Sequence, residues 1–249
     1  WVFFIRHAIP GERVLVQISE IGKSFHRADA VEIIDASPDR ITPACSYFHP
    51  GGCGGCDFHH ISLPRQRELK RQVISEQFQR VAQMEISVPV REVSLSENSG
   101  ARYRGRLTLH VDKSGRAGFL KSRSHEVFPI SDCFVASEKL EMHKVLAKRY
   151  NGIERLTLPD EVRTEEISVH GTTHRYRVSQ ESFWQGHVRA AEVLGEAALH
   201  SLQPRAGEYA LDLYGGVGLF AASFLSLIGA TGSVDIVEGS KSATADAAR

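Results

Sequence analysis

The sequence predicts a multidomain protein that combines a β module with α/β structure, and three observations lead to this prediction. Short runs of alternating apolar and polar residues fill the N-terminal part, a glycine- and cysteine-rich loop follows, and an apolar strand near the end leads into a glycine-rich turn. With 249 residues, 42% of them hydrophobic, the chain can bury more than one core. We expect an OB-like β-barrel over 1–44, an α+β domain over 45–178 and an incomplete Rossmann-like domain over 179–249.

The first 44 residues are predicted to form a small barrel. Val14, Val16 and Ile18 alternate with polar neighbours, and Pro10-Gly11 and Gly22 interrupt the pattern as turn residues do. An OB-like barrel can hold nucleic acid or act only as a scaffold, and the pattern leaves both roles open.

A helix is predicted after Pro64, because proline suits the first turn of a helix and apolar residues then recur at helical spacing. The apolar stripe, expected to face a core, comprises Leu69, Val73, Ile74, Phe78, Val81 and Met84. The basic candidates for RNA binding are Arg65, Arg67, Lys70 and Arg71 on this helix, and Arg102 and Arg104 in a second cluster beside Tyr103. A solvated charged face is the alternative for both clusters.

The middle of the chain mixes both kinds of pattern, as an α+β domain does. Alternation over Leu107–Val111, followed by the turn sequence DKSG, predicts a β-hairpin. Residues Val135–Tyr150 are predicted to form a helix, and strand-like alternation returns over 154–178.

The last part of the chain carries the pattern of a βαβ unit. Its predicted elements are a helix over Gly186–Leu202, a strand over Tyr209–Tyr214, a helix from about Val217 and a strand over Ser233–Glu238. A further helix is expected after this strand.

Four cysteines are present, which in a cytosolic chain favours metal binding or catalysis over a disulfide scaffold. Cys45, Cys53 and Cys56 lie close together on a glycine-rich loop, and Cys133 follows far along the chain. Three thiolates on such a loop can wrap a cube-shaped iron–sulfur cluster, and a distant fourth can close the site. A four-cysteine zinc site is the main alternative, and a redox C-x2-C pair is a weaker one.

The sequence DLYGGVG, Asp212–Gly218, joins an apolar strand to a helix. Gly216 and Gly218 allow a tight turn and a close approach of the backbone to a ligand at the helix N-terminus. Glu238 ends the next strand, where an acidic side chain can accept hydrogen bonds from ribose hydroxyls. Both S-adenosylmethionine and a dinucleotide such as NAD would suit this pattern.

The segment GGCGGCDFHHISLPRQRELKRQ resembles the cluster-binding loop and following helix of the bacterial RNA (uracil-C5)-methyltransferases. This resemblance implies a [4Fe–4S] cluster held by Cys45, Cys53, Cys56 and Cys133, although the family's commoner first gap is five residues and here it is seven. The segment FIRHAIPGERVLVQI is similar to the TRAM domain, an RNA-binding barrel of many such enzymes. YRGRLTLHVD, GFLKSRSHEVFPISDC and SFWQ resemble the family's next landmarks in the family's order.

The resemblance also implies the cofactor. DLYGGVGLF resembles the family's S-adenosylmethionine loop, which selects this cofactor over NAD and assigns it to Asp212, Gly216 and Gly218. It further implies that Gln185 and Tyr214 contact the cofactor, that Glu238 binds its ribose, and that Phe183 stacks on an RNA base; the alternative for Phe183 is a buried core aromatic.

The implied reaction is S-adenosylmethionine-dependent methylation of uracil C5 in structured RNA, with ribosomal RNA favoured over transfer RNA. This chemistry needs a thiolate that adds to C6 and a base that removes the C5 proton. With four cysteines in the cluster, none remains, so the nucleophilic Cys and a Glu base are expected beyond Arg249 and this chain alone is expected to be inactive. The alternatives are a noncatalytic RNA-binding iron–sulfur or zinc protein and an NAD-dependent oxidoreductase.

The charge and hydropathy of the chain limit its partners. Lys and Arg number 30, as do Asp and Glu, so any RNA-binding surface must be local. No apolar run is long enough to cross a bilayer, and the first residues lack the basic start and cleavage site of a signal peptide. We expect a cytoplasmic monomer with no membrane partner.

Overall fold

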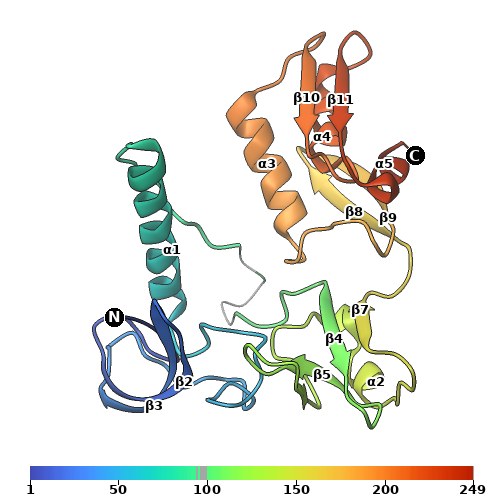
Figure 1. The fold of residues 1–249 in the computed structure, drawn as a ribbon. Coiled ribbons are helices and arrows are strands. Elements are labelled where there is room, and N and C mark those ends of the chain that lie inside the picture. Colours follow the sequence, from blue (N-terminus) through green and yellow to red (C-terminus); the bar gives the residue numbers. More distant parts are fainter. Residues whose placement is uncertain (94, 96–99, 249) are drawn as a thin grey trace. The chain divides into compact units, whose positions relative to one another are not determined.

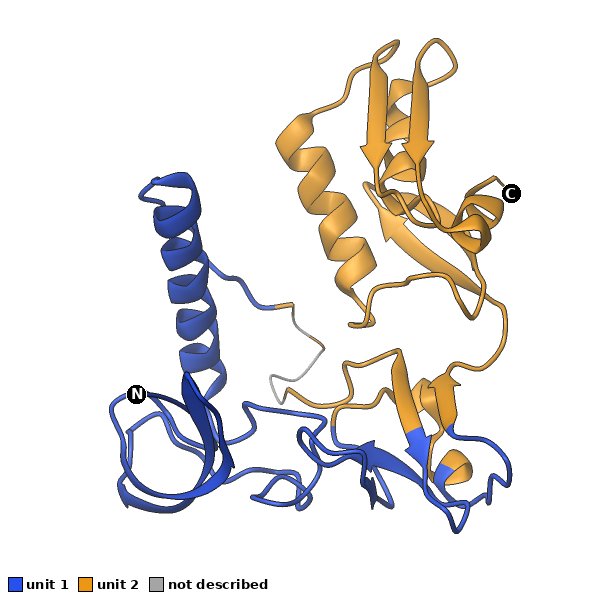
Figure 2. Ribbon diagram, viewed as in Figure 1, with its two compact units in different colours: residues 1–92, 110–134, 146–154 blue, residues 93–109, 135–145, 155–249 orange. Residues whose placement is uncertain are grey.

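The computed structural model describes residues 1–93, 95 and 100–248. The chain divides into two compact units, coloured separately in Figure 2. Unit 1 comprises residues 1–92, 110–134 and 146–154, and unit 2 comprises residues 93–109, 135–145 and 155–249. The three domains expected from the sequence stay a prediction. Among the described residues, no helix combines the length and the apolar character needed to cross a membrane.

Unit 1 begins with a three-stranded sheet made of β1 (Val2–Arg6), β2 (Arg13–Ile21) and β3 (Phe25–Asp35). The central strand β3 pairs in parallel with β1 and antiparallel with β2 (Figure 1). A barrel closes only when its two edge strands pair, and here β1 and β2 lie at opposite edges of the sheet. The predicted strands are confirmed, but within the described residues they form an open sheet and not the expected closed barrel.

The helix α1 (Leu63–Gln77) begins as predicted, with Pro64 in its first turn and the Ser62 hydroxyl accepting a hydrogen bond from the Arg65 backbone N–H. A short π-helical turn (Phe78–Ala82) continues it. The prediction that its apolar stripe faces a core is wrong, because none of the residues of α1 is buried and Val81 is 75% exposed. Helical periodicity defines an apolar face, but burial also requires a second layer of structure over that face.

The predicted hairpin is confirmed. β4 (Leu107–Val111) pairs antiparallel with β5 (Ala117–Leu120), which pairs with β6 (Val127–Pro129). The Asp112 carboxylate closes the turn, because one of its oxygens accepts hydrogen bonds from the backbone N–H groups of Ser114 and Arg116 at 2.8 and 3.0 Å.

The helix predicted over Val135–Tyr150 is largely absent. The structure has only a 3-10 turn (Glu138–Leu140) and a five-residue helix α2 (Met142–Leu146). Glu141 lies between them with φ of +45°, a left-handed conformation that ends one turn before the next begins. Apolar spacing alone did not reveal this break.

Unit 2 contains a β-hairpin followed by the predicted βαβ unit. The hairpin strands are β8 (Arg163–Val169) and β9 (Thr172–Val178), and the short strand β7 (Arg155–Leu158) precedes them. The later elements are α3 (Ala190–Leu202), β10 (Tyr209–Leu213), α4 (Leu219–Ile228), β11 (Ser233–Val237) and α5 (Lys241–Ala247), drawn in orange and red in Figure 1. β10 and β11 pair in parallel, so both strands end at the same edge of the sheet.

The core of unit 2 lies beneath the βαβ unit. One buried cluster comprises Tyr176, Val178, Trp184, Ala191, Val217, Leu219 and Ala243. A second comprises Val169, Leu199, Phe224 and Ile228. These clusters join the hairpin, the segment before α3 and the first turn of α4. Because Val217 of the glycine-rich loop belongs to the first cluster, the loop is anchored to this core.

Candidate functional site

The glycine-rich loop after β10 needs its glycines for backbone conformation and for space. Gly216 and Gly218 have φ of +58° and +85°, values that favour glycine. A Cβ atom on Gly215 would lie 2.7 Å from the Ile236 side chain and 3.0 Å from the Asp212 carboxylate. α4 begins directly after this loop, so the N-terminal end of a helix lies at the edge where β10 ends.

Two carboxylates of the predicted site hold this loop. The Asp212 carboxylate accepts a hydrogen bond from the Ala221 backbone N–H at 3.2 Å, and burial raises its pKa. The Glu238 carboxylate accepts from the backbone N–H groups of Ser240 at 2.7 Å and Gly216 at 2.9 Å. These two hydrogen bonds lower the pKa of Glu238, so it is ionised at neutral pH.

Tyr214 belongs to this loop, whereas Gln185 belongs to another segment that packs against the same core. Tyr214 belongs to the loop, has φ of +59° and is 92% exposed, so its ring is free to pack on a ligand. Gln185 is half-buried and follows Trp184, whose indole packs in the same core cluster as Val217 of the loop. The structure thus brings the segment of Gln185 and the loop together through the core beneath them.

Phe183 is 66% exposed, so the alternative that it is a buried core aromatic is wrong. Its neighbours Ser182 and Trp184 are both buried. The chain therefore buries the side chains on both sides of Phe183 and leaves its ring exposed to a ligand.

The second basic cluster is structured around a stacked ring pair. The rings of Tyr103 and His187 lie 5.3 Å apart and 20° from parallel. The Arg102 guanidinium reaches the Ala136 carbonyl at 3.4 Å, and the Arg104 Nε donates to the Arg106 carbonyl at 3.2 Å. Both guanidinium groups therefore donate hydrogen bonds to backbone carbonyls.

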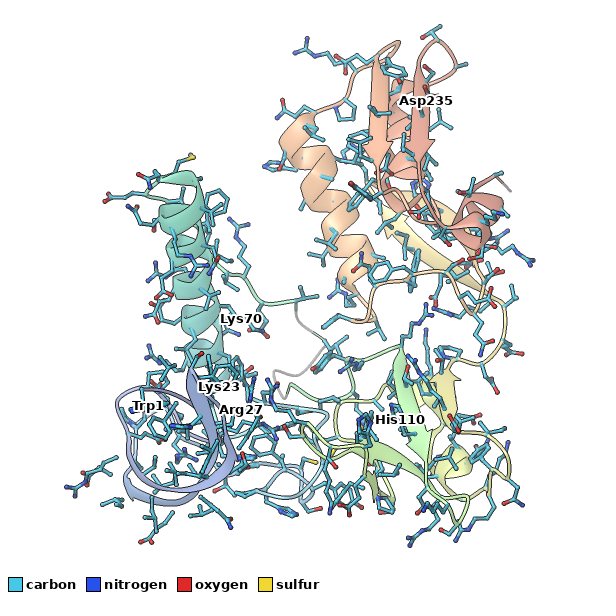
Figure 3. All side chains as sticks on the ribbon, in the orientation of Figure 1. Trp1, Lys23, Arg27, Lys70, His110 and Asp235 are labelled. Atoms are coloured by element: carbon cyan, nitrogen blue, oxygen red, sulfur yellow. The ribbon has the colours of Figure 1, made fainter. Side chains whose placement is uncertain are left out.

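The basic face of α1 is partly neutralised. Arg65 lies 3.7 Å from Asp39, Arg67 lies 3.1 Å from Glu92, and Arg71 lies 2.6 Å from Glu68. Lys70, labelled in Figure 3, forms no ion pair with any of the described residues. These four side chains share one helix, but they do not present four unpaired charges.

The cysteine loop is shaped by close backbone packing. A Cβ atom on Gly54 would lie 2.6 Å from the Leu120 carbonyl oxygen, and one on Gly52 would lie 2.5 Å from the Tyr47 carbonyl oxygen. The Gly55 backbone N–H donates to the Cys53 sulfur at 3.4 Å. The glycines therefore let the loop turn its backbone toward a thiol.

The four cysteine side chains differ in burial, and the environment of Cys53 raises the pKa of its thiol. Burial raises the pKa of the Cys53 thiol, and the charges of Cys133 and Cys45 raise it further. Cys133 is buried, whereas Cys45, Cys53 and Cys56 are half-buried. In the part of the chain that the structure describes, no group of three or more His, Cys, Asp or Glu side chains is arranged to hold a single metal ion.

Arg6 is a contributor to the cysteine loop that the sequence did not reveal. Its guanidinium donates to the Cys56 carbonyl at 3.1 Å and pairs with Asp57 at 3.1 Å. The two partners lie about fifty positions further along the chain, and no local pattern identifies such a distant contact.

Sequence comparison finds several relatives named as RNA methyltransferases, while no protein-family model matches. The chain is 37% identical to an uncharacterized RNA methyltransferase of Streptomyces avermitilis, over 99% of this chain and 69% of the relative. The corresponding values for a protein of Streptomyces coelicolor are 34%, 99% and 65%. The chain thus spans about two thirds of the length of these relatives.

Two further comparisons involve enzymes with a named reaction. A 23S ribosomal RNA uracil-C5 methyltransferase of Shewanella amazonensis is 40% identical over 62% of this chain and 36% of the relative. The crystal structure of a Pyrococcus abyssi tRNA uracil-C5 methyltransferase, in complex with S-adenosyl-L-homocysteine, matches with a TM-score of 0.58. This match covers 95% of this chain and 75% of that one at 15% sequence identity, and it therefore supports the fold alone.

Proposed function

Because this chain belongs to the RNA (uracil-C5)-methyltransferase family, we propose that it supplies the S-adenosylmethionine-binding and RNA-binding parts of an enzyme that methylates uracil C5 in structured RNA. The observation that carries this proposal is the loop after β10, which Glu238 holds through Gly216 at the edge where two parallel strands end. Ligands of α/β proteins bind at this edge. The ribosomal RNA relatives favour ribosomal RNA as the substrate.

The residues present fit S-adenosylmethionine, which would supply the methyl group when bound. Glu238 is ionised and stands at the end of β11, where it can accept hydrogen bonds from ribose hydroxyls. Tyr214 offers an exposed ring, and the α4 N-terminus contributes a positive electrostatic potential. Gln185 lies in the neighbouring segment and is the proposed additional polar contact.

The RNA would contact two further groups of residues. Phe183 projects outward and can stack on a base, an interaction worth about 1–3 kcal/mol that tolerates any base. Positive charge for phosphates comes from Arg65, Arg67, Lys70 and Arg71 on α1 and from Arg102 and Arg104 beside Tyr103. The curved sheet of β1, β2 and β3 is the proposed RNA-binding barrel module, of which the described residues form an open part.

The four cysteines are proposed to hold a [4Fe–4S] cluster. The supporting observations are the backbone N–H that donates to the Cys53 sulfur and the raised pKa of the Cys53 thiol, to which the charges of Cys133 and Cys45 contribute. Backbone N–H groups that donate to the sulfurs are typical of such sites. The cluster would link the loop of residues 45–56 to Cys133 and would stabilise unit 1.

With all four thiols on a cluster, none is free to add to C6 of uracil. We therefore propose that methyl transfer needs a cysteine from outside residues 1–249, and that this chain alone binds cofactor and RNA without turnover. The same chain is proposed to be a monomer.

The first experiment is calorimetric titration of the anaerobically purified chain with S-adenosylhomocysteine and, separately, with NADH. Binding of the homocysteine compound with no binding of NADH is the expected result. The reverse pattern would replace this proposal with the oxidoreductase alternative, and binding of neither would leave a noncatalytic RNA-binding protein.

A further inference from the structure

The segment Ser179–Gln185 is the first part of the connection between β9 and α3; it has no regular secondary structure, yet it carries both Phe183 and Gln185. Ser182 in this segment is fully buried. Irregular segments usually lie at the surface because their backbone groups need partners. A buried position here requires specific partners, and unit 2 provides them from two sides.

The first partner is Asp246 on α5, a buried carboxylate that accepts four hydrogen bonds. One oxygen accepts from the Ser182 hydroxyl at 2.7 Å and from the Ser179 backbone N–H at 2.8 Å. The other accepts from the Ser179 hydroxyl at 2.8 Å and from the Arg177 Nε at 3.0 Å. A buried charge is stable only with such complete pairing, so this site is specific for a carboxylate.

The second partner is Arg106, directly before β4. Its guanidinium donates to the backbone carbonyls of Ser182 and, at 2.6 Å, of Gln180. Burial and the nearby charge of Arg163 lower the pKa of Arg106. Ser182 is therefore held at its side chain by an anion and at its carbonyl by a cation.

These contacts restrict the residues on either side. Ser182 is held by two charged groups, and Trp184 packs in the same core cluster as Val217 of the loop. Phe183 between them is exposed, and Gln185 directly follows Trp184. The helix that carries Asp246 begins directly after Glu238 and Ser240. The same helix thus connects the strand end bearing Glu238 to the segment bearing Phe183 and Gln185.

We propose that Asp246 and Arg106 are positioning residues that clamp Ser182 and thereby orient Gln185 toward the cofactor and Phe183 toward the RNA. This inference rests on the proposed function. Neither residue belongs to the proposed cofactor or RNA contacts, so each acts through Ser182. Removing the clamp frees the segment to move, and binding then has to restore its order.

The test uses two variants of the whole chain, Asp246→Ala and the milder Ser182→Ala, which removes one hydrogen bond to Asp246. The chain has two tryptophans, so in a Trp1→Phe background the fluorescence reports Trp184 alone. We expect each variant to weaken S-adenosylhomocysteine binding, by about tenfold for Asp246→Ala and less for Ser182→Ala. We also expect red-shifted Trp184 emission that iodide quenches more strongly.

The matched control is Arg175→Ala, which breaks an ion pair with Glu166 on the β8–β9 hairpin at 2.6 Å without touching the segment. It should change neither the affinity nor the Trp184 emission. Asp246→Asn keeps one acceptor oxygen and should lie between wild type and Asp246→Ala in both readouts.

The outcomes separate the clamp from the proposed function. If the wild-type chain binds S-adenosylhomocysteine and folded Ser182→Ala binds it equally well with unchanged emission, the clamp is overturned, even where Asp246→Ala fails to fold. If the wild-type chain does not bind the compound, the proposed function fails, and unchanged Trp184 emission in both variants would then overturn the clamp independently.

Discussion

Glu238 accepts a hydrogen bond from the Gly216 backbone N–H at 2.9 Å and so ties the glycine-rich loop to the end of the neighbouring strand. Gly216 has φ of +58°, and in this conformation its N–H points to the carboxylate. The same carboxylate accepts from Ser240 at the start of α5. One side chain therefore sets the loop, the strand end and the next helix relative to one another.

Substitution Glu238→Ala is expected to weaken binding of S-adenosylhomocysteine by about tenfold or more, because the ribose hydroxyls would lose a charged hydrogen-bond acceptor. The backbone hydrogen bonds lower the pKa of Glu238 below its ordinary value of 4.5. The affinity should therefore stay constant from pH 8 to pH 5 and fall only in more acidic solution. Calorimetric titration across this range measures both effects.

The control for this variant is Asp235→Asn on the same strand, labelled in Figure 3, whose carboxylate accepts from the Tyr209 hydroxyl at 2.9 Å. It should bind as wild type does. Equal affinities of wild type and Glu238→Ala would remove Glu238 from the cofactor site.

Replacing Gly218 by alanine should strain the loop. Gly218 has φ of +85°, and a left-handed conformation costs a residue with a Cβ atom about 1–2 kcal/mol. We expect the same change to weaken S-adenosylhomocysteine binding by up to about tenfold. Gly239→Ala is the matched control, because a Cβ atom there meets nothing within 4 Å and φ is not positive. Equal losses in both variants, measured by thermal melting and titration, would contradict the role of loop conformation.

The sequence predicted the βαβ unit well because its signals are local. An apolar strand, glycines at a turn and an amphipathic helix lie within a few residues of one another, and β10, α4 and β11 follow them closely. The helix expected over Val135–Tyr150 was wrong because one left-handed residue, Glu141, breaks it. The buried face expected for α1 was wrong because burial depends on distant layers that periodicity does not encode.

The residues of the candidate site also differ in whether a local sequence pattern identifies them. Asp212, Gly216 and Gly218 were found from a motif whose members are adjacent in sequence. Asp246 and Ser182 lie 64 positions apart, and only the fold brings them to 2.7 Å. A serine and an aspartate at that separation carry no pattern, so sequence reasoning had no means of finding them.

The proposed cluster leads to a prediction about iron. Anaerobically purified wild-type chain should contain about four irons and four sulfides. Cys133→Ser should lose most of both, although it lies far from the other three cysteines in sequence, because the proposed cluster takes its fourth thiolate from Cys133. Ser46→Ala, beside Cys45, is the control and should keep its iron. Full iron content in Cys133→Ser, or zinc in place of iron in wild type, would contradict the cluster.

Glu12 is expected to stabilise unit 1 in a pH-dependent manner. Its carboxylate is buried and accepts from Arg40 at 2.5 and 2.6 Å and from two backbone N–H groups. Burial alone would raise its pKa, but these hydrogen bonds outweigh burial and lower the pKa from 4.5 to about 2. The stabilisation is therefore complete above pH 4.5 and is lost as the pH falls toward 2.

The variant Glu12→Gln should lose about 3–5 kcal/mol at pH 7, because it leaves the Arg40 charge without its partner. Urea unfolding at pH 7, 4 and 2.5 should show the difference from wild type shrinking as the pH falls. Asp35→Asn, which breaks an exposed ion pair with Arg13, should change stability by less than about 1 kcal/mol. A Glu12→Gln deficit that is the same at pH 7 and pH 2.5 would contradict this assignment.

The pairing of charges on α1 predicts unequal contributions to RNA binding. Lys70 forms no ion pair among the described residues, whereas Arg71 is held by both oxygens of Glu68 at 2.6 and 2.8 Å. A phosphate can recruit Lys70 directly but must compete with Glu68 for Arg71. Lys70→Ala should therefore weaken binding of a ribosomal RNA fragment more than Arg71→Ala does.

Salt titrations measure this difference. Each lost phosphate contact reduces the slope of log affinity against log salt by about 0.7–0.9, so titrations between 50 and 200 mM salt should show this reduction for Lys70→Ala. The double variant Glu68→Gln with Lys70→Ala tests whether Glu68 competes with phosphate for Arg71, because freeing Arg71 should restore part of the affinity. No recovery in the double variant, or equal losses in the two single variants, would mean that the ion pairs on α1 do not govern its contact with RNA.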